Sequence, residues 1–274
     1  MNDIILVPTD FSEVCNNAMN QAVEAAKFLN NKIALLHVID KNTRAQLKKD
    51  GEGEDAIEKK LNEIASSIHS EHNVEVETIS KEGDIFTTIA EVAKGLGANL
   101  MYLGTHGKVG MQKLTGSFAL KVVTSSPVPV VVVQKRPFDK GYKKIILPIT
   151  SDSGPWEKTR WATYIAKSFG AEIHIYSIKS PELAEAVKII TNHFDNEMVT
   201  YKVIETDGSN FSKQVIDYAT ANVADMIMIM TNPDKSFSTF LLGSYDEEMI
   251  FNTSQIPVMC INPRKYNWEK IFKI

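Results

Sequence analysis

The chain repeats itself over nearly its whole length, and this duplication limits its architecture more than any single motif does. Residues 4–9, Ile-Ile-Leu-Val-Pro-Thr, correspond to residues 145–150, Ile-Ile-Leu-Pro-Ile-Thr. The same order continues in two further pairs of apolar segments, 98–103 with 224–229 and 127–133 with 255–261. A repeat this long indicates a duplicated domain rather than a solenoid. We therefore expect two domains, residues 1–137 and residues 142–274, each of ordinary domain size.

Within each half, short apolar runs of strand length alternate with longer segments of helical periodicity. This alternation is typical of a parallel sheet covered by crossover helices. In the first half we expect strands near 3–8, 32–39, 74–80, 99–104 and 129–134, and helices near 12–30, 53–72, 84–96 and 116–126, with a polar loop at 48–54. In the second half we expect strands near 144–149, 172–178, 199–205, 225–230 and 256–262, and helices near 155–169, 181–194, 210–222 and 243–252. The sequence thus predicts an α/β fold with two tandem, doubly wound, parallel five-stranded sheets.

The composition is that of a globular protein, with 43% hydrophobic and 23% charged residues. Each half carries 15 Lys and Arg against 17 Asp and Glu, so neither has the basic character of a nucleic-acid-binding domain. The sequence contains no signal-peptide pattern and no run of 18 apolar residues, so we expect a cytoplasmic protein without a membrane partner. Cys15 and Cys260 lack metal-ligand spacing and are expected to be buried thiols.

A glycine-rich segment follows the fourth predicted strand of the first half. Gly104, Gly107 and Gly110 let backbone N–H groups approach a ligand closely, and the segment ends in Gly116-Ser117. We expect Ser117 to cap the next helix, whose unpaired N–H groups favour an anion.

The spacing of this segment resembles that of a known nucleotide-binding family. It contains neither G-x-x-x-x-G-K-[ST] nor G-x-G-x-x-G. Its pattern, G-x2-G-x8-G-S, resembles the ATP-binding loop of the universal stress protein family, G-x2-G-x9-G-[ST], with one residue fewer between the second and third glycines. The surrounding chain resembles this family too. The resemblance implies strand order 3-2-1-4-5, a role in the stress response, and ATP in the crevice beyond strands one and four.

The nucleoside side of this implied site lies at the ends of the first two strands. Pro8, Thr9 and Asp10 match the family's first-strand motif, whose aspartate contacts the nucleoside. The alternative is that Asp10 or Ser12 only caps the following helix. Val38 corresponds to the apolar residue beside adenine, although a valine there is also ordinary core.

The phosphate side is implied by the glycine-rich segment and the helix after it. The corresponding residues are Leu103, Gly104, His106, Gly107, Gly116, Ser117 and Phe118. His106 stands where relatives often carry Arg, so either a neutral imidazole replaces a permanent cation or His106 is a plain loop residue. ATP is the expected ligand, with AMP or ADP as alternatives, and any Mg²⁺ would be held mainly by phosphates and water. We expect no metal site made by protein ligands alone.

The second half departs from this pattern at most of the same places. Met230 and Pro233 replace Gly104 and Gly107, and Ser151 replaces Asp10, with Asp152 shifted by one. Gly243-Ser244 remains, and the helix mouth there would still suit a small anion. We therefore expect nucleotide in the first half only, with the second half as a structural or regulatory partner.

The last strand of each half is apolar, and a bare edge of this kind would promote aggregation. In the family, the last strands of two protomers pair across a twofold axis. Here residues 129–133 can pair with residues 257–261 inside one chain, as a pseudo-dimer, or between chains in a homodimer. The sequence leaves both arrangements open.

The sequence favours binding over catalysis. No nucleophile elbow, metal motif or Cys–His arrangement accompanies the loop, so ATP hydrolysis is expected to be slow at most. The alternative function is a nucleotide-free module for dimerisation and protein contacts, with the loop as a relic. A phosphotransfer receiver would need clustered acidic residues at the first strand, and a related adenylating or pyrophosphatase enzyme would need a Ser-Gly-Gly loop there, and neither is present.

Overall fold

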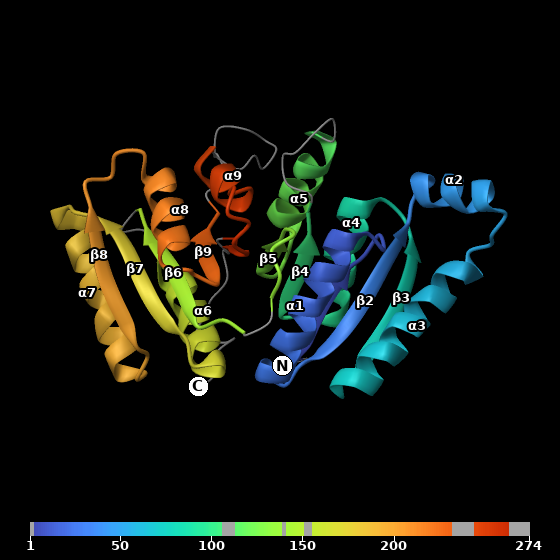
Figure 1. Ribbon diagram of the computed structural model, residues 1–274, viewed down its shortest axis with the longest axis horizontal. Helices are drawn as coiled ribbons and strands as arrows, with labels where there is room; N and C mark the ends of the chain where they lie inside the picture. Colours follow the sequence, from blue (N-terminus) through green and yellow to red (C-terminus); the bar gives the residue numbers. More distant parts are fainter. Residues whose placement is uncertain (1–2, 106–112, 139–140, 151–154, 232–243, 263–274) are drawn as a thin grey trace.

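The computed structural model describes residues 3–105, 113–138, 141–150, 155–231 and 244–262 (Figure 1). The first half contains β1 (Ile4–Pro8), α1 (Glu13–Leu29), β2 (Lys32–Ile39), α2 (Lys41–Asp50), α3 (Asp55–His72), β3 (Val76–Glu82), α4 (Ile85–Leu96), β4 (Leu100–Gly104), α5 (Lys113–Ser125) and β5 (Val130–Val133). The second half contains β6 (Lys144–Ile149), α6 (Pro155–Phe169), β7 (Glu172–Ile178), α7 (Pro181–Asn196), β8 (Tyr201–Thr206), α8 (Phe211–Ala221), β9 (Met226–Met230), α9 (Ser244–Ile250) and β10 (Val258–Ile261).

The strands form one continuous sheet in the order β3-β2-β1-β4-β5-β10-β9-β6-β7-β8. Within each half the strands are parallel and follow the expected order 3-2-1-4-5, which confirms the predicted fold class. The halves meet at β5 and β10, which pair antiparallel with Met259 opposite Val131. Of the two arrangements that the sequence left open, this structure has the pairing inside one chain.

Helices cover both faces of the sheet, and each face has a core that runs across both halves. One core packs the sheet against α1, α3, α6 and α7, and the other against α4, α5, α8 and α9. Strands buried on both faces explain the uninterrupted apolar runs such as Val130–Val133 and Val258–Ile261. Both cysteines are buried free thiols, as expected.

An aromatic cluster fixes the connection between the halves. Tyr142 is fully buried, its hydroxyl lies 2.9 Å from that of Tyr102, and its ring packs on Phe169. Gly141 precedes it with φ +69°, and a Cβ there would lie 3.1 Å from Phe169 and 3.3 Å from Phe28. Glycine therefore meets both the backbone conformation and the close packing at this turn.

Two elements differ from the prediction. Helix α2 was not expected, and it includes residues 48–50 of the predicted polar loop. Helix α5 begins at Lys113 rather than near residue 116, so Gly116 and Ser117 lie inside the helix. The other predicted strands and helices are present with small shifts at their ends. Among the described helices, none has the length and apolar character needed to cross a bilayer.

Candidate functional site

A cavity of about 390 Å³ opens at the carboxyl edge of the first half, a volume within the usual range for small-ligand pockets. It lies beyond the ends of β1, β2 and β4, with walls from α1, α2, α4 and α5. In doubly wound sheets, ligands bind at this edge, where the strand order reverses. Seven of the predicted site residues line the cavity: Pro8, Thr9, Asp10, Val38, Leu103, Gly104 and Phe118.

The other four predicted residues belong to the glycine-rich segment. His106 and Gly107 lie outside the described residues. Gly116 and Ser117 are the fourth and fifth residues of α5, so Ser117 is not the N-cap that the sequence predicted. Helix α5 has three residues before Gly116, which are Lys113, Leu114 and Thr115. None of them disfavours a helix as Gly or Pro would.

Asp10 lies at the rim of the cavity, where β1 ends. Its Oδ1 accepts a 2.9 Å hydrogen bond from the Ser12 backbone N–H, which turns the chain into α1. Ser12 occupies the N-cap position, but its side chain makes no capping hydrogen bond to the helix. Partial burial raises the pKa of Asp10, but hydrogen bonds from Ser12 and Cys15 outweigh this effect and bring the pKa below its usual value. Asp10 is therefore an ionised acceptor at neutral pH.

His37 was not predicted as a site residue, yet it lines the cavity from β2. Its Nδ1 lies 2.8 Å from the Thr9 carbonyl oxygen, so Nδ1 carries the proton and donates it. Its Nε2 lies 3.3 Å from the Thr43 hydroxyl. Burial lowers the pKa of His37, so the ring is neutral at pH 7 and Nε2 is the acceptor. The ring therefore links the end of β1 to α2.

Phe11 packs against this imidazole. Its ring stacks on His37 with a centroid distance of 4.8 Å, and Lys60 Nζ lies 4.3 Å from the centroid of the Phe11 ring. Phe11 has φ +66°, which is uncommon for a bulky residue. Since such conformations persist only where the surroundings enforce them, the turn after β1 is held tightly in place.

Helix α2 supplies a polar wall, which we call the α2 wall and define as Asp40, Asn42 and Thr43. Asp40 caps the helix, because its Oδ1 accepts the Thr43 N–H at 2.8 Å. Its Oδ2 accepts from the Asn42 side chain at 3.1 Å. Gly51 ends the helix in a left-handed conformation and donates its N–H to Leu47 O. The two capping residues, Asp40 and Gly51, are the sequence signals that could have indicated α2.

The opposite wall is apolar. Ile85 and Ile89 of α4 and Phe118 and Val122 of α5 line the cavity there. Phe118, which is 38% exposed, stacks on Phe86 at a centroid distance of 5.1 Å. An apolar slot faced by a few polar groups is typical of sites for flat heterocyclic ligands.

Gly104 is needed for packing as well as for access to a ligand. A Cβ at this position would lie 2.6 Å from Val14 O and 2.8 Å from Cys15 N, both backbone atoms of α1. Helix α1 can therefore pack this closely on β4 only because residue 104 has no side chain.

We expect Gly104→Ala to lower the free energy of unfolding by about 2 kcal/mol, because α1 must shift to make room. Urea denaturation measures this change. Gly95→Ala is the control, since a Cβ at Gly95 in α4 meets nothing within 4 Å. That replacement should be stabilising by about 0.5–1 kcal/mol through helix propensity. Equal stability of the Gly104→Ala variant and the wild type would contradict the steric account.

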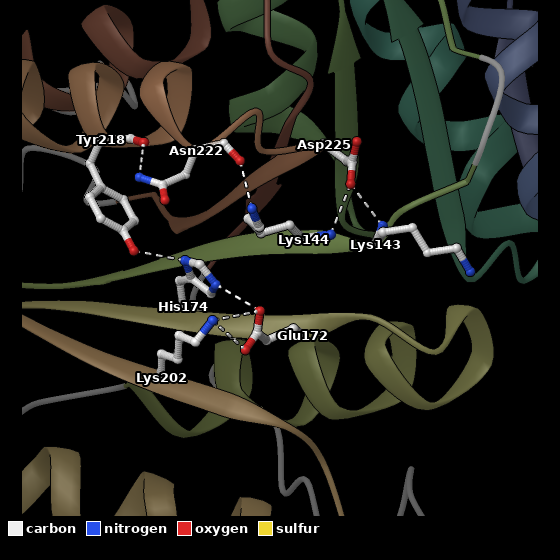
Figure 2. A network of polar contacts seen from close by, with 8 residues as sticks. All are labelled: Lys143, Lys144, Glu172, His174, Lys202, Tyr218, Asn222 and Asp225. Carbon is white, nitrogen blue, oxygen red and sulfur yellow. Dashed lines mark hydrogen bonds and ion pairs between the residues drawn. The ribbon is translucent and has the colours of Figure 1, made fainter.

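A second polar cluster lies in the other half, at the amino ends of its strands (Figure 2). His174 is buried, with Nδ1 2.9 Å from the Tyr218 hydroxyl and Nε2 3.0 Å from Glu172. Asp225 accepts the backbone N–H groups of Lys143 and Lys144, each at 2.8 Å. The cluster fixes the start of β6 and β7 at the edge opposite the carboxyl ends, so we assign it a structural role. No three His, Cys, Asp or Glu side chains in the described ranges gather around a metal position.

Fold and cavity together define a doubly wound α/β protein with its pocket at the switch point of the first half. The universal stress protein family model matches residues 1–134. The chain is 32% identical over 143 residues to universal stress protein MJ0531 of Methanocaldococcus jannaschii, covering 48% of this chain and 81% of that protein. It is 31% identical over 156 residues to universal stress protein MJ0577 of the same organism, covering 48% and 94%. The chain belongs to the universal stress protein family.

A solved structure extends the fold comparison to both halves. The crystal structure of a universal stress protein from Archaeoglobus fulgidus superposes with a TM-score of 0.79, covering 96% of this chain and 99% of that one. Sequence identity is 19%, so this likeness concerns the fold alone. The predicted family and the predicted fold are both confirmed.

Proposed function

We propose that the protein binds ATP, or another adenine nucleotide, in the first-half cavity, as a stress-response protein whose second half is a structural or regulatory partner. The observation that supports this most is the convergence of seven residues, chosen from separate sequence motifs, on one cavity. Asp10 can accept hydrogen bonds from ribose hydroxyls. Val38, Ile85 and Ile89 offer apolar contacts to a base.

The surroundings of the cavity favour binding without efficient hydrolysis. Both ring nitrogens of His37 already have partners, Thr9 O and the Thr43 hydroxyl, so His37 is poorly suited to act as a general base. Burial, together with the negative charge of Asp10, raises the pKa of the Cys15 thiol to about 12 and leaves the thiol unreactive. Any Mg²⁺ would arrive with the phosphates.

Calorimetric titration with ATP tests this proposal. We expect one ATP per chain, and Asp10→Ala should weaken binding by about tenfold or more through loss of hydrogen bonds to a charged group. Asp217→Ala is the control. Asp217 is an exposed residue of α8 in the second half, where it pairs with Lys213 of the same helix. Mass spectrometry of protein purified without added nucleotide provides a second readout.

Two ATP molecules per chain would contradict the placement of the site, as would unchanged affinity in the Asp10→Ala variant. Absence of binding, with no nucleotide retained on purification, would favour the alternative of a nucleotide-free interaction module. The continuous sheet through β5 and β10 gives such a module its internal pairing.

A further inference from the structure

The α2 wall stands at one end of the cavity, and its carboxylate is held in a fixed orientation. Asp40 bonds the Thr43 N–H through Oδ1 and the Asn42 amide through Oδ2. Thr43 is tied in turn to His37 on β2, which anchors α2 to the sheet. Figure 1 shows α2 beyond the carboxyl ends of β2 and β3, at the outer side of the first half. A side chain held this way loses little freedom when a ligand binds.

The order of the strands gives the cavity a direction. Strand β1 lies between β2 and β4, so Asp10 lies between the α2 wall on one side and Gly104 with α5 on the other. A nucleotide with its phosphates toward β4 and α5, and its ribose at Asp10, directs its base toward β2. The base then lies near Val38, with its polar edge toward the α2 wall.

We propose that Asp40 is a specificity-determining residue that selects a base with an exocyclic amino group on this edge, as in adenine, over one with a carbonyl there. An ionised carboxylate only accepts hydrogen bonds, so it attracts the 6-amino group of adenine and repels the 6-oxo group of hypoxanthine. Discrimination of this kind is strong because, with hypoxanthine bound, the carboxylate would face another hydrogen-bond acceptor and would lose its donor. This inference rests on the proposed function, since it concerns the same cavity.

The test compares the affinities of ATP and ITP, which differ at position 6 and in the protonation of N1. The wild-type protein should bind ATP about tenfold more tightly than ITP, a usual effect of one hydrogen bond to a charged group. Asp40→Asn keeps an oxygen that can cap α2 but places an amide donor in the site. It should reduce the ATP-to-ITP ratio by about tenfold, toward equal binding.

Two further variants separate base recognition from helix capping. Asp84→Asn is the matched control, because Asp84 caps α4 by accepting the Phe86 and Thr87 N–H groups and does not line the cavity. Its ATP-to-ITP ratio should equal that of the wild type. Asp40→Ser retains a capping oxygen without the charge and should also lose the preference. A purely structural role of Asp40 would change both affinities together and leave their ratio constant.

An unchanged ratio in Asp40→Asn, with ATP still bound, would overturn this inference while leaving the proposed function intact. Wild-type protein that binds ATP and ITP equally would also overturn it. Failure of the wild type to bind either nucleotide would overturn the proposed function and this inference together.

Discussion

Wild-type protein should gain stability relative to a Lys158→Met variant as the pH rises from 7 to 9, because the variant lacks a buried lysine whose pKa is low in the folded state. Lys158 lies in α6 with 6% of its surface exposed, and its Nζ donates a hydrogen bond to Pro148 O at the end of β6. Burial lowers the pKa of Lys158 to about 7, although the negative charge of Asp246 on α9 opposes this shift. The folded protein therefore holds a poorly solvated ammonium group.

The same lysine gives a pH dependence whose sign is fixed. The pKa of Lys158 is about 7 in the folded protein against 10.5 when unperturbed. Between these values the unfolded chain binds more protons than the folded one, so stability rises with pH. The destabilisation is full below pH 7 and disappears as the pH approaches 10.5. From pH 7 to pH 9 the wild type should gain about 2 kcal/mol relative to Lys158→Met.

Urea denaturation of both proteins at several pH values up to 9 measures this difference. Higher pH is unsuitable, because burial raises the pKa values of Cys260 and Tyr142, which ionise first in the unfolded chain. Lys144→Met is the control, since this lysine is only half buried and donates to Asn222 O. Parallel pH profiles for the wild type and Lys158→Met would show that Lys158 is not held in a low-pKa environment.

Lys158 also bears on how the second half differs from the first. By the internal repeat, Lys158 corresponds to Ala18, and Asp246 corresponds to Ala119. Both alanines are buried, and the first half has its cavity at this edge. The second half has instead gained two opposite charges, on α6 and α9, at the carboxyl edge of its sheet. Two buried ionisable side chains there fit the sequence-based expectation that this half does not bind nucleotide.

Sequence reasoning predicted the fold because the decisive signals were local and repeated. Apolar strands at matching places in both halves fixed the strand positions, and the carboxyl ends of parallel strands share one edge of a sheet. This explains why Asp10 and Gly104, far apart in sequence, were placed together before the structure was known.

The missed features have physical reasons. Helix α2 buries only Leu47 among its residues, so apolar periodicity gave no signal, although Asp40 and Gly51 are good helix boundaries. His37 lies within an apolar strand and has the sequence pattern of a core residue. Lys158 has the sequence pattern of an exposed helical lysine. Its burial could not be predicted, because it depends on how α6 and α9 pack in three dimensions.

Two amide side chains join the halves in a nearly symmetric way, and their loss should have the largest effect on stability. Gln134, after β5, donates to Ile250 O and Asn252 O at the end of α9, at 3.4 and 3.2 Å. Asn262, after β10, donates to Val123 O and Ser126 O at the end of α5, at 2.6 and 3.1 Å. Each amide thus binds two carbonyl groups at a helix end of the opposite half, of which Asn252 O and Val123 O also accept the backbone N–H groups of Gln255 and Ser126.

We expect Gln134→Leu and Asn262→Leu each to lower the free energy of unfolding by about 1–3 kcal/mol, because each removes two hydrogen bonds between the halves. The two sites have no shared partner, so the double variant should lose about 2–6 kcal/mol, the sum of the two single losses. Gln46→Leu is the control, since Gln46 bonds Asp50 on the exposed surface of α2 and should change stability by about 0.5 kcal/mol at most. Denaturation followed by circular dichroism measures all four variants.

Because both cores run through both halves, the wild type should unfold in one transition. A double variant as stable as the wild type would show that the β5–β10 pairing and the two cores hold the halves together without these amides.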